Sequence, residues 1–143
     1  MYQHITIVGR LGRDPEMRYT PSGQAVTSFN VATDRQYTDA NGQKVKETTW
    51  FRVSVWGKQA ETTNQYLKKG SMVLVDGRLT PDPKTGGPRV WKRQDGTEGA
   101  SFEISASSVR FLSTRSETSG AGGGEYGDEG AVAPAGGDED IPF

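Results

Sequence analysis

The chain has 143 residues, with 17 Lys and Arg in residues 1–115 against 11 Asp and Glu there, and seven acidic residues but no basic one in residues 116–143. This division into a body of net charge +6 and a tail of net charge −7 predicts a polyanionic partner for the body. The absence of cysteine and the presence of a single histidine exclude disulfides, cysteine nucleophiles, histidine-based triads and the usual metal sites, so we expect no catalytic residue, metal or cofactor.

Five stretches of the first 115 residues have the composition and alternation of β-strands. They are residues 5–12, 26–35, 46–56, 72–79 and 101–112. In the first strand, Gly9 and Gly12 predict a bulge or bend, because glycine in a strand often marks an irregularity of the ladder. In the second, Phe29 and Val31 fall on one face, which we expect to be buried.

Turns and loops connect these strands. Residues 14–23 are framed by Pro and Gly signals and are predicted to form a loop. The Asn41-Gly42 pair predicts a tight hairpin turn, since both residues tolerate positive φ angles. Residues 81–88 are too rich in Pro and Gly to be regular, and residues 89–93 are expected to form a hairpin arm that turns at Asp95-Gly96.

One helix is predicted, over residues 59–69, where apolar side chains recur at helical spacing. Lys68 and Lys69 stand at its C-terminal end, where the helix dipole favours cations, and Gly70 is expected to cap it. An all-β chain with one helix between strands 3 and 4 fits a five-stranded Greek-key barrel, the OB-fold, which binds oligonucleotides or sugars. Other small barrels are the alternative.

Residues 49–56 carry the sharpest chemical signal. Strand alternation places Phe51, Val53 and Val55 on a core face and Trp50, Arg52, Ser54 and Trp56 on the opposite face. Two tryptophans exposed beside a guanidinium are unfavourable in water unless something covers them. Nucleobases would do so by stacking, without reading sequence. Packing against another sheet or subunit and sugar recognition are the alternatives, but a neutral sugar does not explain the basic charge.

Other aromatic side chains lie beside basic residues. Tyr37 follows Arg35, and Trp91 stands between Arg89 and the Lys92-Arg93 pair on a polar hairpin. Tyr37 could equally be a packing residue at a strand end, whereas a core role suits Trp91 less well. Scattered lysines would together offer a surface that follows a phosphate backbone. They are Lys44, Lys46, Lys58, Lys68 and Lys69.

The C-terminal tail has the composition of a disordered arm over residues 116–137, which are mostly Gly, Ser, Ala and acidic residues. It ends in an acidic cluster with an apolar tip, which is either the accidental end of a solubilising tail or a peptide held out for a partner. The tip residues are Asp138, Glu139, Asp140, Ile141, Pro142 and Phe143. We therefore divide the chain into a binding domain (1–115), a linker (116–137) and a docking tip (138–143).

In several motifs the chain resembles the bacterial single-stranded DNA-binding proteins of the SSB family. The motifs follow the family's order from the opening strand to the acidic C-terminal peptide: residues 8–19, 47–53, 56–58, 66–70, 75–79 and 138–143. The resemblance implies an OB-fold homotetramer that wraps single-stranded DNA. It also implies a tail that recruits replication, recombination and repair enzymes.

Transferred to this chain, the resemblance also implies particular site residues. The implied DNA-stacking residues are Tyr37, Trp50, Trp56 and Trp91, and the contacts to the DNA backbone are Arg52, Lys58, Lys68, Lys69, Arg89 and Arg93. Residues 81–88 lengthen the hairpin before Trp91 relative to the family. The single OB pattern favours four subunits over two.

Three other classes of function compete with this interpretation. An OB-fold RNA binder would prefer poly(U) over poly(dT), and a primosomal OB protein usually lacks the acidic Ile-Pro-Phe tip. An enzyme fits least, because no nucleotide-binding or metal-binding motif is present. Residues 1–4 lead directly into a strand without the features of a signal peptide, and no apolar run approaches the roughly 20 residues of a membrane span. We therefore expect a cytoplasmic, nucleoid-associated protein.

Overall fold

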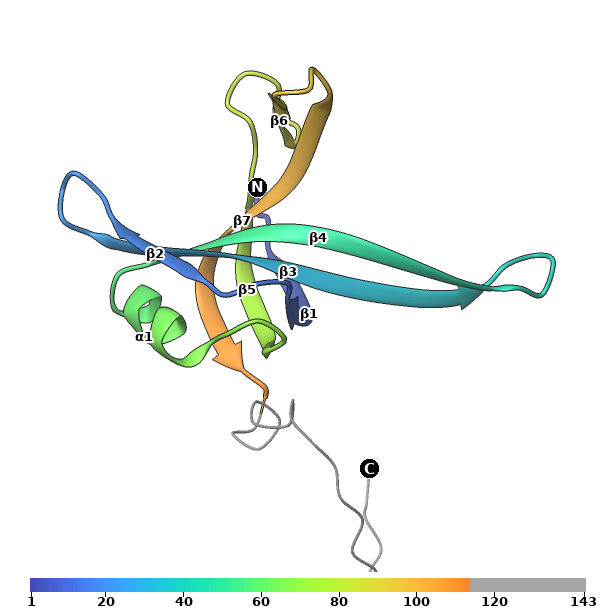
Figure 1. Cartoon of the computed structure of the whole chain (residues 1–143), viewed down its shortest axis with the longest axis horizontal. Coiled ribbons are helices and arrows are strands. Elements are labelled where there is room, and N and C mark those ends of the chain that lie inside the picture. The colour runs from blue at the N-terminus through green and yellow to red at the C-terminus, as the bar shows by residue number, and fades with distance from the viewer. Residues whose placement is uncertain (114–143) are drawn as a thin grey trace, which may run out of the picture.

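Seven strands and one helix make up the described part of the chain, residues 1–113, in a computed structural model of the protein (Figure 1). In chain order they are β1 (Ile5–Leu11), β2 (Glu16–Tyr19), β3 (Ala25–Thr38), β4 (Lys44–Trp56), α1 (Lys58–Tyr66), β5 (Met72–Thr80), β6 (Arg89–Lys92) and β7 (Glu98–Phe111). The predicted linker and docking tip lie outside the described residues, so the proposed division into domain, linker and tip stays a prediction.

Five of the strands close into a barrel in the order β1, β5, β7, β4, β3 and back to β1. All neighbours in it are antiparallel except β4 and β7, which run parallel with Phe51 opposite Phe102. The single helix connects β4 to β5, the third and fourth strands of the barrel. The predicted OB-fold barrel is therefore confirmed, with β2 added beside β3 and β6 added beside β7.

The barrel closes at the glycine-rich point of β1. Residues 5–10 pair with β5, and Arg10 and Leu11 also pair with Ala32 and Val31 of β3. A Cβ atom on Gly9 would press on the carbonyl oxygen of Ala32 and would lie 2.6 Å from a Val31 methyl group. Glycine is required here because the backbones of β1 and β3 approach too closely for any side chain.

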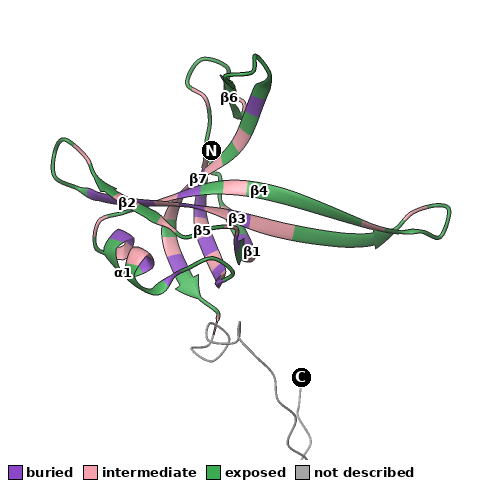
Figure 2. Cartoon of the chain, in the orientation of Figure 1, coloured by how far each residue is buried: buried purple, intermediate pink, exposed green. Residues whose placement is uncertain are grey.

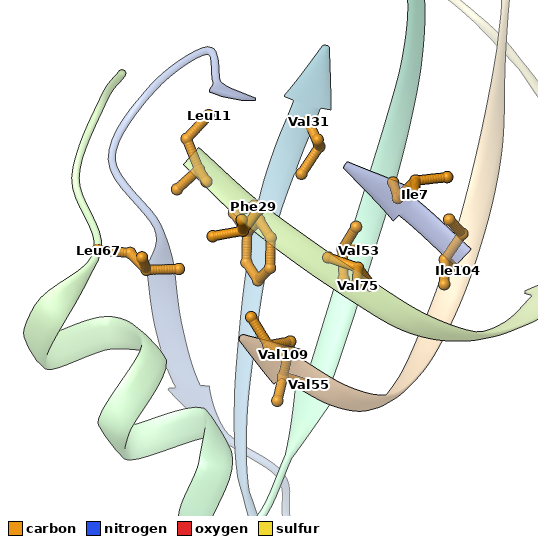
Figure 3. Packing of buried hydrophobic residues seen from close by; sticks show 11 residues of the cluster. Ile7, Leu11, Phe29, Val31, Val53, Val55, Leu67, Val75, Ile104 and Val109 are labelled. Carbon is orange, nitrogen blue, oxygen red and sulfur yellow. The ribbon is translucent and has the colours of Figure 1, made fainter. Parts of the chain in front are cut away.

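The barrel interior is filled mainly by β-branched and aromatic side chains from all five barrel strands (Figure 3). Val31, Val53, Val55, Val73 and Val75 are fully buried. Their positions alternate along β3, β4 and β5, as expected for strands with one face in a core. Phe29 and Val31 lie in this cluster, as their shared face predicted.

Two hairpins extend from the barrel as arms (Figure 1). The β3–β4 arm continues the ladder to the pair Thr38–Lys44, and most of its residues are exposed (Figure 2). Its turn is the predicted one: Gly42 has a φ of 78°, and an Asp39 carboxylate oxygen accepts hydrogen bonds from the backbone N–H groups of Asn41 and Gln43. The β6–β7 arm carries Trp91.

Two local predictions were wrong. The loop predicted over residues 14–23 contains strand β2, which pairs with β3 from Glu16 to Tyr19. The helix ends at Tyr66, so Lys68 and Lys69 are not in its last turn and Gly70 is not its cap. Tertiary contacts explain the early end, because the chain turns extended at Leu67 to bury that side chain in the core.

Candidate nucleic-acid interface

The outer face of β4 carries the predicted row of polar and aromatic side chains. Val53 and Val55 are fully buried, whereas Trp50 and Trp56 remain 52% and 43% exposed. Arg52 is exposed between the two tryptophans. The tryptophans are six residues apart, about 20 Å along the strand. The structure therefore presents two exposed indoles and a guanidinium on one face of the barrel.

The indole of Trp50 packs against the backbone of Gly12, just beyond the end of β1. A Cβ atom on Gly12 would lie 2.5 and 2.7 Å from two carbons of the six-membered ring of Trp50. The ring therefore has a fixed support on one side while about half of the residue stays exposed. An aromatic ring held in this way is preorganised for stacking, because little rotamer entropy is left to lose on binding.

Trp91 has the same kind of support on the β6–β7 arm. It pairs across the ladder with Gly99, where a Cβ atom would lie 2.8 to 3.1 Å from three atoms of the indole. Arg89 and Trp91 occupy alternate positions of β6, opposite Ser101 and Gly99. Since cross-strand partners share a face, the register places both side chains on the same face as Glu103.

Arginines from three strands surround Trp91. A cleft of about 500 Å³ is lined by Arg18 of β2, Arg52 of β4, Arg89 and Trp91 of β6, and Ser101 and Glu103 of β7. Arg89 lies 3.8 Å from Glu103, whereas within residues 1–113 neither Arg18 nor Arg52 belongs to an ion pair. The cleft therefore combines a stacking surface with an excess of positive charge, which is the chemistry that binds single strands.

Local sequence pattern does not identify Arg18 as a site residue, because its segment is predicted to be a loop and a loop residue has no predictable face. In the structure β2 pairs Arg18 with Val26, and Val26 in turn pairs with Trp56. Arg18 therefore belongs to the same sheet face as the β4 row. Strand-like alternation in the Glu-Met-Arg-Tyr segment was the signal that could have found it.

Tyr37 is not brought to this face. It pairs with Val45 on the β3–β4 arm, five positions from Trp50, so alternation places it on the opposite face of the ladder. The Arg35 guanidinium lies 5.1 Å from the centre of its ring, and its hydroxyl donates a 3.1 Å hydrogen bond to Glu47. That hydrogen bond raises the pKa of Tyr37 above its usual value. A stacking role for Tyr37 stays a prediction.

The predicted lysines occupy different environments. Lys58 is the first residue of α1, and Lys68 and Lys69 stand on a turn that is fastened to the end of β1. The backbone N–H of Lys69 donates to Asp14 at 2.8 Å, and that of Gly70 donates to the Leu11 carbonyl at 2.9 Å. These bonds join the lysine turn to the segment whose Gly12 supports Trp50.

Two other basic residues of the arms, Lys46 and Arg93, make polar contacts within their own arm. Lys46 pairs with Asp34 at 3.3 Å, and the pKa of Asp34 is lowered first by a hydrogen bond from Thr48 and then by Lys46. Arg93 donates 3.4 Å hydrogen bonds to the Thr97 hydroxyl and the Glu98 carbonyl across its turn. Of the predicted DNA-backbone contacts, Arg52 and Arg89 are the two that line the cleft around Trp91 (the tryptophan cleft).

The fold and the side chains on the outer face of the sheet together define a class of protein. It is an OB barrel with an aromatic and basic surface across its sheet. Within residues 1–113 there is no cluster of side chains suited to hold a metal ion, and no helix long and apolar enough to cross a membrane. The chain matches the single-strand binding protein family over residues 2–112 and belongs to that family.

Individual relatives agree with this assignment. The chain is 41% identical over 116 residues to a single-stranded DNA-binding protein of Neisseria meningitidis serogroup A, covering 81% of this chain and 63% of that protein. It is 42% identical over 125 residues to one from Bacillus cereus, covering 87% and 65%. The chain thus spans somewhat less than two thirds of these relatives.

The fold is also similar to that of a solved protein structure. A deletion mutant of the single-stranded DNA binding protein from Thermus aquaticus aligns with a TM-score of 0.62 and 30% identity. The alignment covers 80% of this chain and 52% of that chain.

Proposed function

We propose that this protein binds single-stranded DNA without sequence preference and has no catalytic activity. The observation that carries the proposal is the outer sheet face, where Trp50 and Trp91, each supported by a glycine, lie with Arg18 and Arg52, which belong to no ion pair within residues 1–113. Bases stack on such rings whatever their identity, and the guanidiniums pair with phosphates. Membership of the single-strand binding protein family and relatives named for single-stranded DNA binding support the same conclusion.

A fluorescence titration tests the proposal. Oligo(dT) of increasing length should quench the tryptophan emission, and its affinity should fall with salt by about 0.7 log units per phosphate contact for each log unit of salt. Poly(U) at matched salt is the comparison. Absence of quenching by any DNA length would refute the proposal, and a clear preference for poly(U) would favour the RNA-binding alternative.

We propose further that the protein assembles as a homotetramer, with DNA wrapped over its aromatic and basic surfaces. The support is the single barrel formed within residues 1–113, together with the family assignment. Static light scattering on the free protein tests the subunit count. A mass of four chains is the expected result, and a stable monomer or dimer at micromolar concentration would contradict it.

The C-terminal tip is proposed to recruit replication, recombination and repair enzymes in the nucleoid. The support is compositional: Ile141 and Phe143 are apolar and could fill a pocket, while the carboxylates of residues 138–140 could meet basic groups at its rim. Deletion of Phe143 should abolish capture of such enzymes but leave oligo(dT) affinity equal or slightly higher. Loss of DNA binding on this deletion would assign the tip to the binding domain instead.

A further inference from the structure

A second, apolar hollow lies beside the tryptophan cleft. It has a volume of about 250 Å³ and is formed by the 81–88 loop, the end of β5 and Phe102 of β7. Besides Phe102, its lining includes the apolar Leu79, Pro81 and Pro88 and the polar Gln3, Thr80 and Glu103. This volume is below the roughly 300–1,000 Å³ of drug-sized ligand pockets, so it suits one small flat ring system.

Phe102 is the aromatic surface of this hollow. Alternation along β7 assigns it to the barrel side with Ile104, yet Phe102 is 48% exposed while Ile104 is buried. Behind it stands the ring of Phe51, with a centroid distance of 6.0 Å and an angle of 42° between the planes. A half-exposed ring supported by a second ring is available for stacking on its open side.

The 81–88 loop forms a defined wall and is held by its own hydrogen bonds. The backbone N–H of Asp82 donates to the Gly87 carbonyl at 2.9 Å, and that of Gly86 donates to the Asp82 carbonyl at 2.9 Å. The Asp82 carboxylate accepts from the backbone N–H groups of Lys84 and Thr85. Such a loop needs little ordering when a ligand arrives, which favours binding.

The hollow and the tryptophan cleft lie on opposite sides of β7, because Phe102 shares the barrel side with Ile104 whereas Trp91 shares the face of Glu103. A third depression of about 500 Å³ lies between them and includes Lys84. It shares Thr80, Pro81 and Glu103 with the Phe102 hollow, and it shares Arg89 and Glu103 with the cleft. A strand stacked on Trp91 would therefore reach Phe102 by passing Arg89 and turning round the end of β5 at Thr80 and Pro81, with Arg89 and Lys84 as its phosphate partners.

We propose that the Phe102 hollow is an additional nucleotide subsite, in which a base of the bound single strand stacks on Phe102 against the wall of the 81–88 loop. This rests on the proposed function. The subsite lengthens the path of the DNA by the step from Trp91 to Phe102. Its specificity is for a flat ring and not for a particular base, because the surrounding side chains are mainly apolar.

The test compares two substitutions at one position in the full-length protein. Phe102→Leu keeps the apolar bulk but removes the π-face, whereas Phe102→Trp keeps a flat ring. Long oligo(dT) should bind F102L several-fold more weakly than wild type and F102W about as tightly. The difference should disappear for oligonucleotides too short to extend beyond Trp91. Equal affinities of F102L and wild type for every length would overturn the proposal.

A direct readout comes from F102W with Trp50, Trp56 and Trp91 replaced by Phe, which leaves the introduced indole as the sole tryptophan. Long oligo(dT) should quench its emission, and short oligo(dT) should not. An indole that is already shielded without DNA and unaffected by it would mean that another subunit covers the hollow, which would also overturn the proposal. Because wild type is titrated in parallel, failure of the subsite is distinguished from failure of DNA binding itself.

Discussion

Replacing Trp50 with Ala is expected to weaken oligo(dT) binding by about 1–3 kcal/mol, a factor of roughly 5 to 150 in Kd. The indole is half-exposed and supported by Gly12, so its removal deletes a stacking surface without opening a cavity in the core. Trp91→Ala should have an effect in the same range, because Trp91 has an equivalent support on Gly99. If the two sites act independently, the free-energy losses of the double variant should add.

The measurement is a fluorescence anisotropy titration of labelled oligo(dT), with thermal unfolding as the check on folding. Tyr66→Ala is the matched control, since Tyr66 is an exposed aromatic residue on α1 and not on the sheet face. Its affinity should equal that of wild type. Tight binding by the Trp50→Ala, Trp91→Ala double variant would contradict the stacking interpretation.

Gly12→Ala tests the support itself. The added methyl group would displace the Trp50 ring, so Gly12→Ala should lower the oligo(dT) affinity of the otherwise wild-type protein. The same substitution should not lower the affinity further in the Trp50→Ala variant. A double-mutant cycle measures this coupling directly. Equal losses in both backgrounds would show that Gly12 acts on DNA binding by another route than through Trp50.

Replacing Gly9 with Ala is expected to destabilise the barrel by about 1–3 kcal/mol, which corresponds to a Tm lower by roughly 5–20 °C. The new methyl group would overlap the Ala32 carbonyl, a backbone atom of β3 that cannot rotate away. The two strands must separate where β1 closes the barrel on β3. Circular dichroism melting at matched protein concentration measures the effect.

Gly87→Ala is the control for this substitution. Its Cβ atom would meet only the Thr85 hydroxyl, at an ordinary 3.7 Å. It should therefore melt close to wild type. A Gly9→Ala variant that melts with the Gly87→Ala control would mean that β1 and β3 can move apart at little cost, and that closure does not depend on glycine.

Much of the binding face could be predicted because it depends on local alternation. A strand with a period of two must separate Trp50, Arg52 and Trp56 from Val53 and Val55, whatever the rest of the chain does. The Asn41-Gly42 turn is similarly local, since it depends on backbone angles that few residues adopt. The position of the single helix among five strands favours the OB-fold over other small barrels.

Strand register and the packing of distant segments cannot be predicted from local sequence patterns. The β3–β4 register decides that Tyr37 faces away from Trp50, and the pairing of β2 with β3 brings Arg18 into the site. Helical spacing continued past the point where burial of Leu67 ends α1. Gly12 and Gly99 were isolated glycines in the sequence, and only the fold places them beneath indoles.

The type of fold, the basic charge of the body and the side of β4 that carries the tryptophans can thus be predicted, because each follows from composition or from neighbours along one strand. Which side chains share the site depends on the folded arrangement of the strands. Strand pairing joins residues that are far apart in the chain, and a one-residue change in register would place a different set of side chains on the face.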